Sequence, residues 1–128
     1  MGDFRIRKLG KVDDLEIWLV DGERIRNEVD IDFTCGGHHE VYPWYIPDRE
    51  IWLDNALSPL DRTATLLHEL VEHEVMKHRG WNYDRGHDLA SKIEAPFRVR
   101  LAKRPPAVTS VESARRAFDS WREQFLAS

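Results

Sequence analysis

Short runs of alternating apolar and polar residues dominate the first part of the chain. Residues 15–20 are rich in strand-forming side chains, Asp21 and Gly22 follow, and alternation resumes over residues 24–26. A strand, a two-residue Asp-Gly turn and a second alternating stretch are typical of a β-hairpin. We therefore expect a hairpin that turns at Asp21 and Gly22.

Two further strands are expected in the next part of the chain. Residues 29–33 alternate strictly between apolar and polar side chains, and Gly36 and Gly37 end this pattern. Residues 51–53 form a short apolar strand. The segment between these strands contains two prolines, and proline cannot donate to a ladder of backbone hydrogen bonds. A loop or an edge strand is expected there.

A long helix is predicted over residues 59–79. Ser58 is a favourable capping residue, Pro59 suits the first helical position, and Asp61 places a negative charge in the first turn. Gly80 can adopt the left-handed conformation that commonly ends a helix. Both ends of this helix are therefore marked by local signals.

Two more helices are predicted after it. Asp84 can cap the first of them, and Pro96 is expected to break or kink it just before the proline. The second should begin after Thr109, because Thr109 and Glu112 have the spacing of a capping box. Residues 111–126 then repeat apolar side chains at helical spacing, which predicts a helix that packs on the rest of the chain.

These elements predict one α+β domain. A chain of 128 residues with 41% hydrophobic residues has the size and apolar content of a single domain. Its expected organisation is an N-terminal antiparallel sheet of three to five strands within residues 1–57, two helices within residues 58–103 and a packing helix within residues 108–127.

Composition narrows the expected partners and compartment. The net charge of −4 and the interleaving of basic with acidic residues do not favour nucleic acid as a partner. A short basic cluster formed by Arg98, Arg100, Lys103 and Arg104 is interpreted as a solvated helix face or linker. The sequence has no apolar run long enough for a membrane span or a secretory signal, and Cys35 is its only cysteine. We expect a cytoplasmic protein with no membrane partner and no disulfide.

The candidate chemistry lies on the long helix. His68 and Glu72 are four residues apart, so they stack one turn above the other and can reach a single cation. Glu69 follows the first of these ligands, as in the His-Glu-x-x-His helix of metallopeptidases, where this glutamate is the general base. Here Glu72 replaces the second histidine, and zinc accepts a carboxylate oxygen in that position. The displaced histidine, His73, is an alternative ligand or a group near the substrate.

The next helix offers a third ligand. His87 is our preferred choice, and Glu94, seven residues later on the same face, would orient a histidine or complete the coordination. One zinc ion so held would lower the pKa of its water to about 7, Glu69 would take the proton, and hydroxide would attack a polarised carbonyl. Tyr83 and His73 are candidate donors to the resulting oxyanion. A peptide or protein substrate is expected for such a hydrolase.

The motif carries a family resemblance. The chain resembles the zincin-like metallopeptidases in three places: residues 51–53, residues 66–72 with His68, Glu69 and Glu72, and the stretch from Tyr83 through His87 to Glu94. The pattern is closest to the small uncharacterised zincin-like proteins of bacterial and phage genomes, with a His-Glu-x-x-Glu variant. The resemblance implies a zincin-like fold in which residues 51–54 run along the substrate cleft and lead to the metal-binding helix.

Other interpretations of these residues remain open. A solvated polar helix face laced with i, i+4 pairs would also explain residues 68–73. We favour a metal because residues 68–87 hold four of the six histidines, although His78 falls on the apolar arc and is expected to pack near the helix end. His38 and His39 follow a glycine turn, and a polar loop explains them more simply than a loop ligand does.

Two rival functions are compatible with the same residues. The first is a non-catalytic metal-binding structural or interaction module, in which His68, Glu72, His87 and Glu94 close all four coordination positions. The second is a carboxylate-bridged iron or manganese site suggested by the three glutamates, but the chain lacks the Glu-x-x-His pairs of the usual di-iron pattern. We therefore expect zinc rather than iron or manganese.

Overall fold

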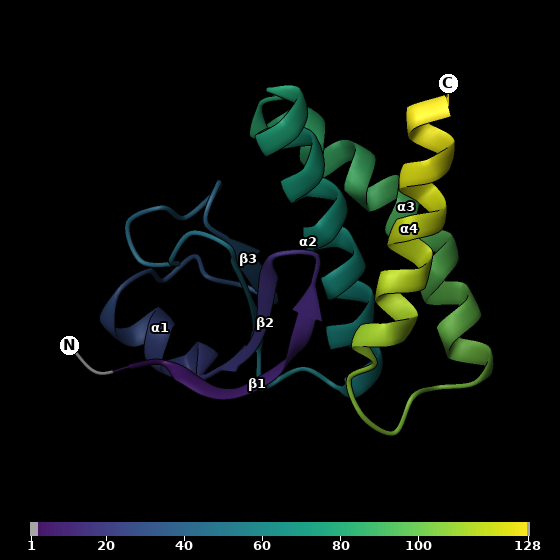
Figure 1. Cartoon of the computed structure of the whole chain (residues 1–128). Helices are drawn as coiled ribbons and strands as arrows, with labels where there is room; N and C mark the ends of the chain where they lie inside the picture. Colours follow the sequence, from purple (N-terminus) through teal and green to yellow (C-terminus); the bar gives the residue numbers. More distant parts are fainter. Residues whose placement is uncertain (1–2, 128) are drawn as a thin grey trace.

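The computed structural model describes residues 3–127 and has an α+β fold (Figure 1). The strands are β1 (Arg5–Val12), β2 (Leu15–Val20), β3 (Gly36–His38) and β4 (Glu50–Asp54), and the helices are α1 (Gly22–Glu28), α2 (Pro59–Arg79), α3 (Tyr83–Lys103) and α4 (Val111–Ala127). The strands form one sheet in the order β1-β2-β4-β3. Helix α2 packs against β3 and β4, and both α3 and α4 pack on α2.

The sheet is mixed rather than antiparallel, because β2 and β4 pair in parallel while β1–β2 and β3–β4 pair antiparallel. The predicted hairpin at Asp21 and Gly22 is also wrong: the hairpin lies one strand earlier, between β1 and β2. Asp21 instead caps α1, where its carboxylate accepts a hydrogen bond of 3.1 Å from the backbone N–H of Arg24. Asp-Gly serves equally as a turn and as a helix start, so the local sequence did not distinguish them. Helix α1 therefore comes in addition to the three helices that the sequence predicts.

The alternating stretch at residues 29–33 is a turn and not a strand. Ile31 is 80% exposed while Phe33 is fully buried, so the alternation reflects one anchored aromatic side chain beside exposed neighbours. The glycines expected to end a strand instead begin β3. A Cβ on Gly36 would lie 2.7 Å from the carbonyl oxygen of Trp52, so only glycine allows β3 to approach β4 this closely. The proline-containing loop between β3 and β4 is confirmed.

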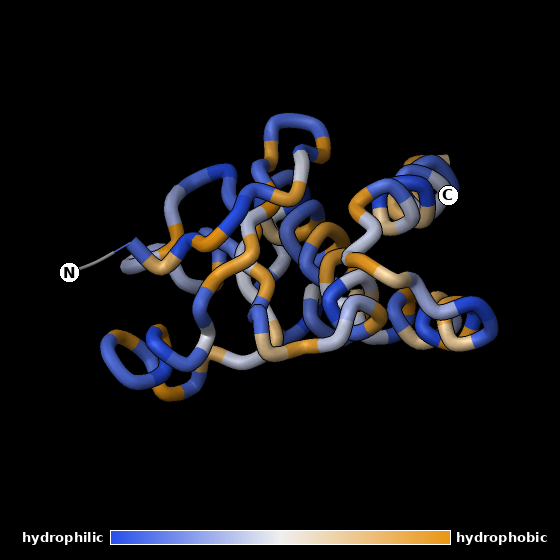
Figure 2. The backbone as a smooth tube through the Cα atoms, turned by 90° about the horizontal axis from the view of Figure 1, so that it is seen from below, coloured by the Kyte–Doolittle hydropathy of each residue, from blue (hydrophilic) through white to orange (hydrophobic). Residues whose placement is uncertain are grey.

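Helix α2 begins and ends where the sequence predicts. The Ser58 side chain accepts from the backbone N–H of Asp61 at 3.1 Å, and Gly80 takes the left-handed conformation with φ of 68°. Most buried apolar residues of α2 belong to the larger of two core clusters, together with buried residues of β1, β2, β4, α3 and α4. Figure 2 shows many hydrophobic segments in the middle of the molecule, where strands and helices meet. Helix α2 therefore lies between the sheet on one side and helices α3 and α4 on the other.

Helix α3 is capped by Asn82 rather than Asp84, through a 2.9 Å bond from the backbone N–H of Arg85 to the Asn82 side chain. It continues through Pro96 without the predicted break. A proline inside a helix costs about 3 kcal/mol, but this helix also buries Ala90 and Phe97 in the core. Helix α4 begins one residue later than the Thr109 cap implies, because the Ser110 hydroxyl accepts from the backbone N–H of Ser113. No helix among the described residues is long and apolar enough to cross a membrane.

Candidate metal centre

The polar arc of α2 is buried. His68, Glu69, Glu72 and His73 are 8%, 5%, 2% and 4% exposed. The interpretation of this arc as a solvated helix face is therefore wrong. Burying two carboxylates and two imidazoles is costly unless they are paired or hold a cation. The arrangement around Glu72 shows how this cost is offset.

Three ligand atoms converge on one point between α2 and α3. His68 Nε2 lies 3.2 Å from Glu72 Oε2 and 3.1 Å from His87 Nδ1, and the distance from His87 Nδ1 to Glu72 Oε2 is 3.2 Å. The three atoms thus form a nearly equilateral triangle. Zinc at about 2.0–2.2 Å from each ligand in tetrahedral geometry requires ligand atoms about 3.3 Å or slightly more apart. The residues chosen from sequence as ligands are brought together, and their spacing suits one ion.

The ring of His68 is held from its far side. Its Nδ1 lies 2.9 Å from Glu94 Oε1, and since a carboxylate only accepts, Nδ1 carries the proton and donates. The other oxygen of Glu94 accepts two bonds from Arg98, which also contacts Asp61. This chain fixes the orientation of the His68 ring and directs Nε2 at the triangle, where this nitrogen can bind a metal once it has lost its proton. Glu94 is therefore an orienting residue in this arrangement, and it does not share the triangle.

Arg98 was missed as a functional residue. Its neighbours Arg100, Lys103 and Arg104 suggested one basic cluster, but Arg98 lines the pocket and binds Glu94 from one turn further along α3. The signal that could have found it is the i, i+4 spacing of Glu94 and Arg98 on the face that carries His87.

The interpretation of His38 as a polar loop residue is wrong. His38 is fully buried on β3, and its Nε2 lies 3.0 Å from Glu72 Oε1. Burial opposes ionisation of Glu72, but the hydrogen bonds from His38 and His68 lower its pKa to about 2, so the carboxylate accepts and His38 donates. Each oxygen of Glu72 therefore has its own partners: His38 on one side, and His68 with His87 on the other.

Glu69 lies beside the triangle, and its carboxylate makes no hydrogen bond with another residue of the described range 3–127. One of its oxygens is 4.0 Å from His68 Nε2, and its ligand atoms group with those of His38 and Glu72 within 4.8 Å. Burial and then the charge of Glu72 raise the pKa of Glu69 to about 7. A carboxylate with this pKa can take up and release a proton near neutral pH.

His73 and Tyr83, the other predicted site residues, do not contribute atoms to the ligand triangle. His73 is not among the grouped ligand atoms; its ring packs edge-on against His38 at 5.4 Å, and burial lowers its pKa to about 3. The Tyr83 ring stacks on His87, with its hydroxyl 3.3 Å from His87 Nδ1. Burial raises the pKa of Tyr83, so its phenol stays protonated and can donate close to the triangle.

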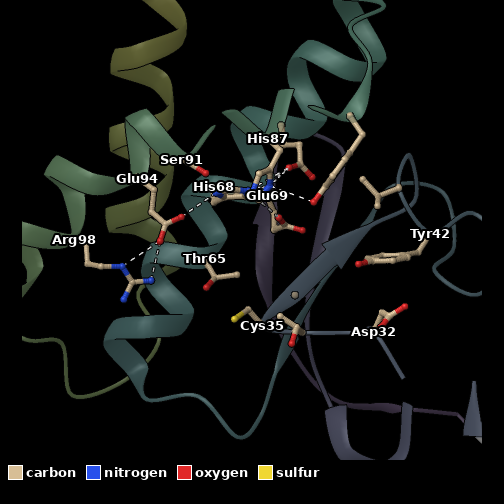
Figure 3. A pocket seen from close by; sticks show the side chains of 15 residues that line it. Asp32, Cys35, Tyr42, Thr65, His68, Glu69, His87, Ser91, Glu94 and Arg98 are labelled. Atoms are coloured by element: carbon tan, nitrogen blue, oxygen red, sulfur yellow. Dashed lines mark hydrogen bonds and ion pairs between the residues drawn. The ribbon is translucent and has the colours of Figure 1, made fainter. Parts of the chain in front are cut away.

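A pocket of about 350 Å³ opens onto the triangle (Figure 3). Its wall combines the site residues of α2 and α3 with Gly36 of β3 and with residues before and after this strand, including Cys35 and Tyr42. The expectation that residues 51–54 run along the cleft is wrong, because β4 is paired on both sides and wholly buried. The strand beside the pocket is β3, which lies at the edge of the sheet.

A third group of candidate ligand atoms, from His39, Glu40 and Asp48, lies elsewhere. The Lys77 ammonium is 3.9 Å from Glu40 and 3.2 Å from Asp48, and His39 Nδ1 lies 2.7 Å from the backbone oxygen of Ile46. A cation of the chain already pairs with these carboxylates, so the triangle is the stronger candidate centre.

The chain matches no protein-family model, no curated protein and no solved structure. The resemblance to zincin-like metallopeptidases stays a prediction that rests on the motif.

Proposed function

We propose that the protein is a metal-dependent hydrolase that acts on a peptide or amide bond, with one zinc ion held by His68, Glu72 and His87. The observation that carries the proposal is the triangle of ligand atoms with sides of 3.1–3.2 Å beside a buried carboxylate. Two imidazoles and one carboxylate are a ligand set of catalytic zinc sites, which leave a position free for water and substrate.

Zinc in this position would supply a Lewis acid that polarises a carbonyl and lowers the pKa of water to about 7. The residues of the chain divide the remaining work. Glu69, with a pKa raised to about 7, is the base that takes a proton from the attacking water. Tyr83, whose hydroxyl is 3.3 Å from His87 Nδ1, can donate a hydrogen bond to the oxygen on which negative charge develops.

Access to solvent supports a catalytic rather than a purely structural role. The His87 side chain is 49% exposed, and the pocket beside the triangle gives room for a substrate. The non-catalytic alternative needs Glu94 as a fourth ligand, but Glu94 is bound to the opposite nitrogen of His68 and to Arg98. These contacts therefore favour a zinc site that keeps one coordination position open.

Metal analysis of the purified protein tests the proposal first. We expect about one equivalent of zinc in the wild type and loss of most of this zinc in His68→Ala and His87→Ala. Bound iron or manganese in place of zinc would show that the proposed metal is wrong. Glu69→Gln should keep the metal and lose about 10²–10⁴-fold in hydrolysis of a mixture of quenched fluorescent peptides. A purified protein that binds no zinc, or a Glu69→Gln variant that hydrolyses the peptides at the wild-type rate, would overturn the proposal.

A further inference from the structure

The pocket extends beyond the ligand triangle on two sides. Figure 3 shows Tyr42 and Asp32 on one side of the pocket, Glu94 and Arg98 on the other, and His68 and His87 between them. A substrate whose reacting bond lies at the triangle would therefore present its neighbouring groups to one of these two sides.

The two sides differ in whether their charged side chains are already paired. Arg98 is the only Lys or Arg that lines the pocket, and it is already bound to Glu94 and Asp61. Asp32 is exposed, and its carboxylate has no hydrogen-bond or ion-pair partner within residues 3–127. The nearby Asp30 is engaged, since it accepts from the Tyr45 hydroxyl and from the backbone N–H of Asp32. On the Tyr42 side of the pocket, Asp32 thus offers a carboxylate that is free to bind a ligand.

Tyr42 supplies an aromatic surface next to this carboxylate. Its ring lies against Gly37, where an added Cβ would be only 2.6 Å from Tyr42 Cδ2, and it contacts the rings of Trp44 and Tyr45 at 5.7 Å and 5.3 Å. Burial raises the pKa of Tyr42 to about 12, so the ring remains a neutral phenol. An aromatic ring fixed beside a free carboxylate is the arrangement that attracts cations, by cation–π attraction and by charge.

We infer that Asp32 and the ring of Tyr42 form a subsite for a positively charged group of the substrate, an ammonium or a guanidinium. The inference rests on the proposed function, because it takes the pocket beside the triangle as the substrate site. It adds a substrate class: peptides or amides that carry a positive charge near the bond to be cut. The charge can come from a basic side chain or from a free amino terminus.

Hydroxamates of single amino acids are suitable probes, because the hydroxamate binds the metal while the rest of the molecule reaches the pocket wall. Affinities for the zinc-loaded protein are measured by calorimetry. One pair of probes, Nα-acetyl-lysine and Nα-acetyl-norleucine hydroxamate, isolates a side-chain charge. A second pair, leucine and Nα-acetyl-leucine hydroxamate, isolates the amino terminus.

In at least one pair we expect the charged probe to bind about tenfold more tightly, the sum of an exposed ion pair and a cation–π contact. This preference should fall to about threefold in Asp32→Asn, because the cation–π contact with Tyr42 remains, and it should weaken at high salt. Asp88→Asn is the matched control, because it removes an exposed carboxylate of α3 that does not line the pocket and pairs with Lys92. The control should keep the preference.

The outcomes separate the two proposals. Hydroxamates that bind with no preference for charge, or a preference that Asp32→Asn leaves intact, overturn the subsite while the metal centre stands. A protein that takes up no metal and binds no hydroxamate overturns both. The pair of probes that shows the Asp32-dependent preference identifies the source of the charge.

Discussion

His38 and Glu72 are 34 residues apart in the sequence, yet His38 Nε2 lies 3.0 Å from Glu72 Oε1. The contact joins the edge strand of the sheet to α2, which carries two of the three proposed metal ligands. Because the other oxygen of Glu72 faces His68 and His87, the position of this carboxylate depends on both halves of the fold.

His38→Ala should therefore weaken zinc binding although His38 is outside the triangle. Loss of a partner that orients a metal ligand typically costs about 10–100-fold in metal affinity. Zinc affinity measured by competition with a chelator tests this. His78→Ala is the control, since it removes an exposed histidine of α2. Unchanged affinity in His38→Ala would contradict the role of the contact, and two zinc equivalents in the wild-type protein would make His38, Glu69 and Glu72 a second ligand group.

Glu94→Gln tests the chain that orients His68. The glutamine can still accept from His68 Nδ1, but it no longer neutralises Arg98 or strengthens the basicity of the ring. We expect zinc affinity to fall about tenfold with the fold retained. Glu123→Gln, an exposed change on α4, should leave affinity unaltered. Equal affinities in the two variants would show that the contact with His68 has no influence on the metal.

Zinc affinity should rise with pH. In the metal-free chain burial opposes the charge on His68, but hydrogen bonds to Glu72 and Glu94 outweigh burial and raise its pKa to about 10. A nitrogen ligand must lose its proton before it binds a metal, so zinc has to displace this proton. Apparent affinity should rise about tenfold per pH unit between about pH 6.5 and 8.5. An affinity that does not change over this range would contradict the protonated state of His68.

The stability of the metal-free protein should change with pH in the opposite direction. The folded pKa of His68 lies above its unfolded value of about 6.5. Its contribution to stability is therefore fully present below about pH 6.5 and is lost as the pH rises towards the folded pKa. Urea denaturation of metal-free wild type and of His68→Ala between about pH 6.5 and 9 measures this effect. The wild type should lose more stability than the variant over that range.

Gly37→Ala tests the wall of the pocket. The new methyl group would lie 2.6 Å and 2.7 Å from two ring carbons of Tyr42, so the ring must move. Overpacking of this kind costs about 1–3 kcal/mol of unfolding free energy. Gly80→Ala is the comparison: it meets no atom within 4 Å, and its strain comes only from a φ of 68°. Denaturation should show the loss in both, whereas only Gly37→Ala should also reduce the preference for charged hydroxamates.

The parts of the site that the sequence predicts are those set by local geometry. Ser58 and Gly80 mark the ends of α2 because caps depend on neighbouring residues alone, and helical periodicity was enough to choose His87 on the adjoining helix. His38 depends on the pairing of β3 with β4 and on how this edge strand packs on α2, which no local pattern encodes. The same holds for Asp32, whose neighbours in the pocket come from distant parts of the chain.

The segment before α2 was the least predictable for a related reason. Asp21 can start a helix or make a turn, and the choice depends on burying Ile25 in the second core cluster. Proline at position 96 gave a local signal for a break, but packing of Ala90 and Phe97 on α2 outweighs it. In both places a long-range apolar contact decided the structure.

The proposed metal ligands and the proposed substrate subsite come from different stretches of the chain. The whole ligand triangle, its base and its orienting carboxylate lie on α2 and α3, joined by a short connection, whereas Asp32 and Tyr42 lie on the segment between α1 and β4. Selection or engineering can therefore exchange one stretch while keeping the other. If the proposed activity holds, libraries confined to residues 30–46, with His38 held constant, would change the substrate preference and leave the ligand triangle in place.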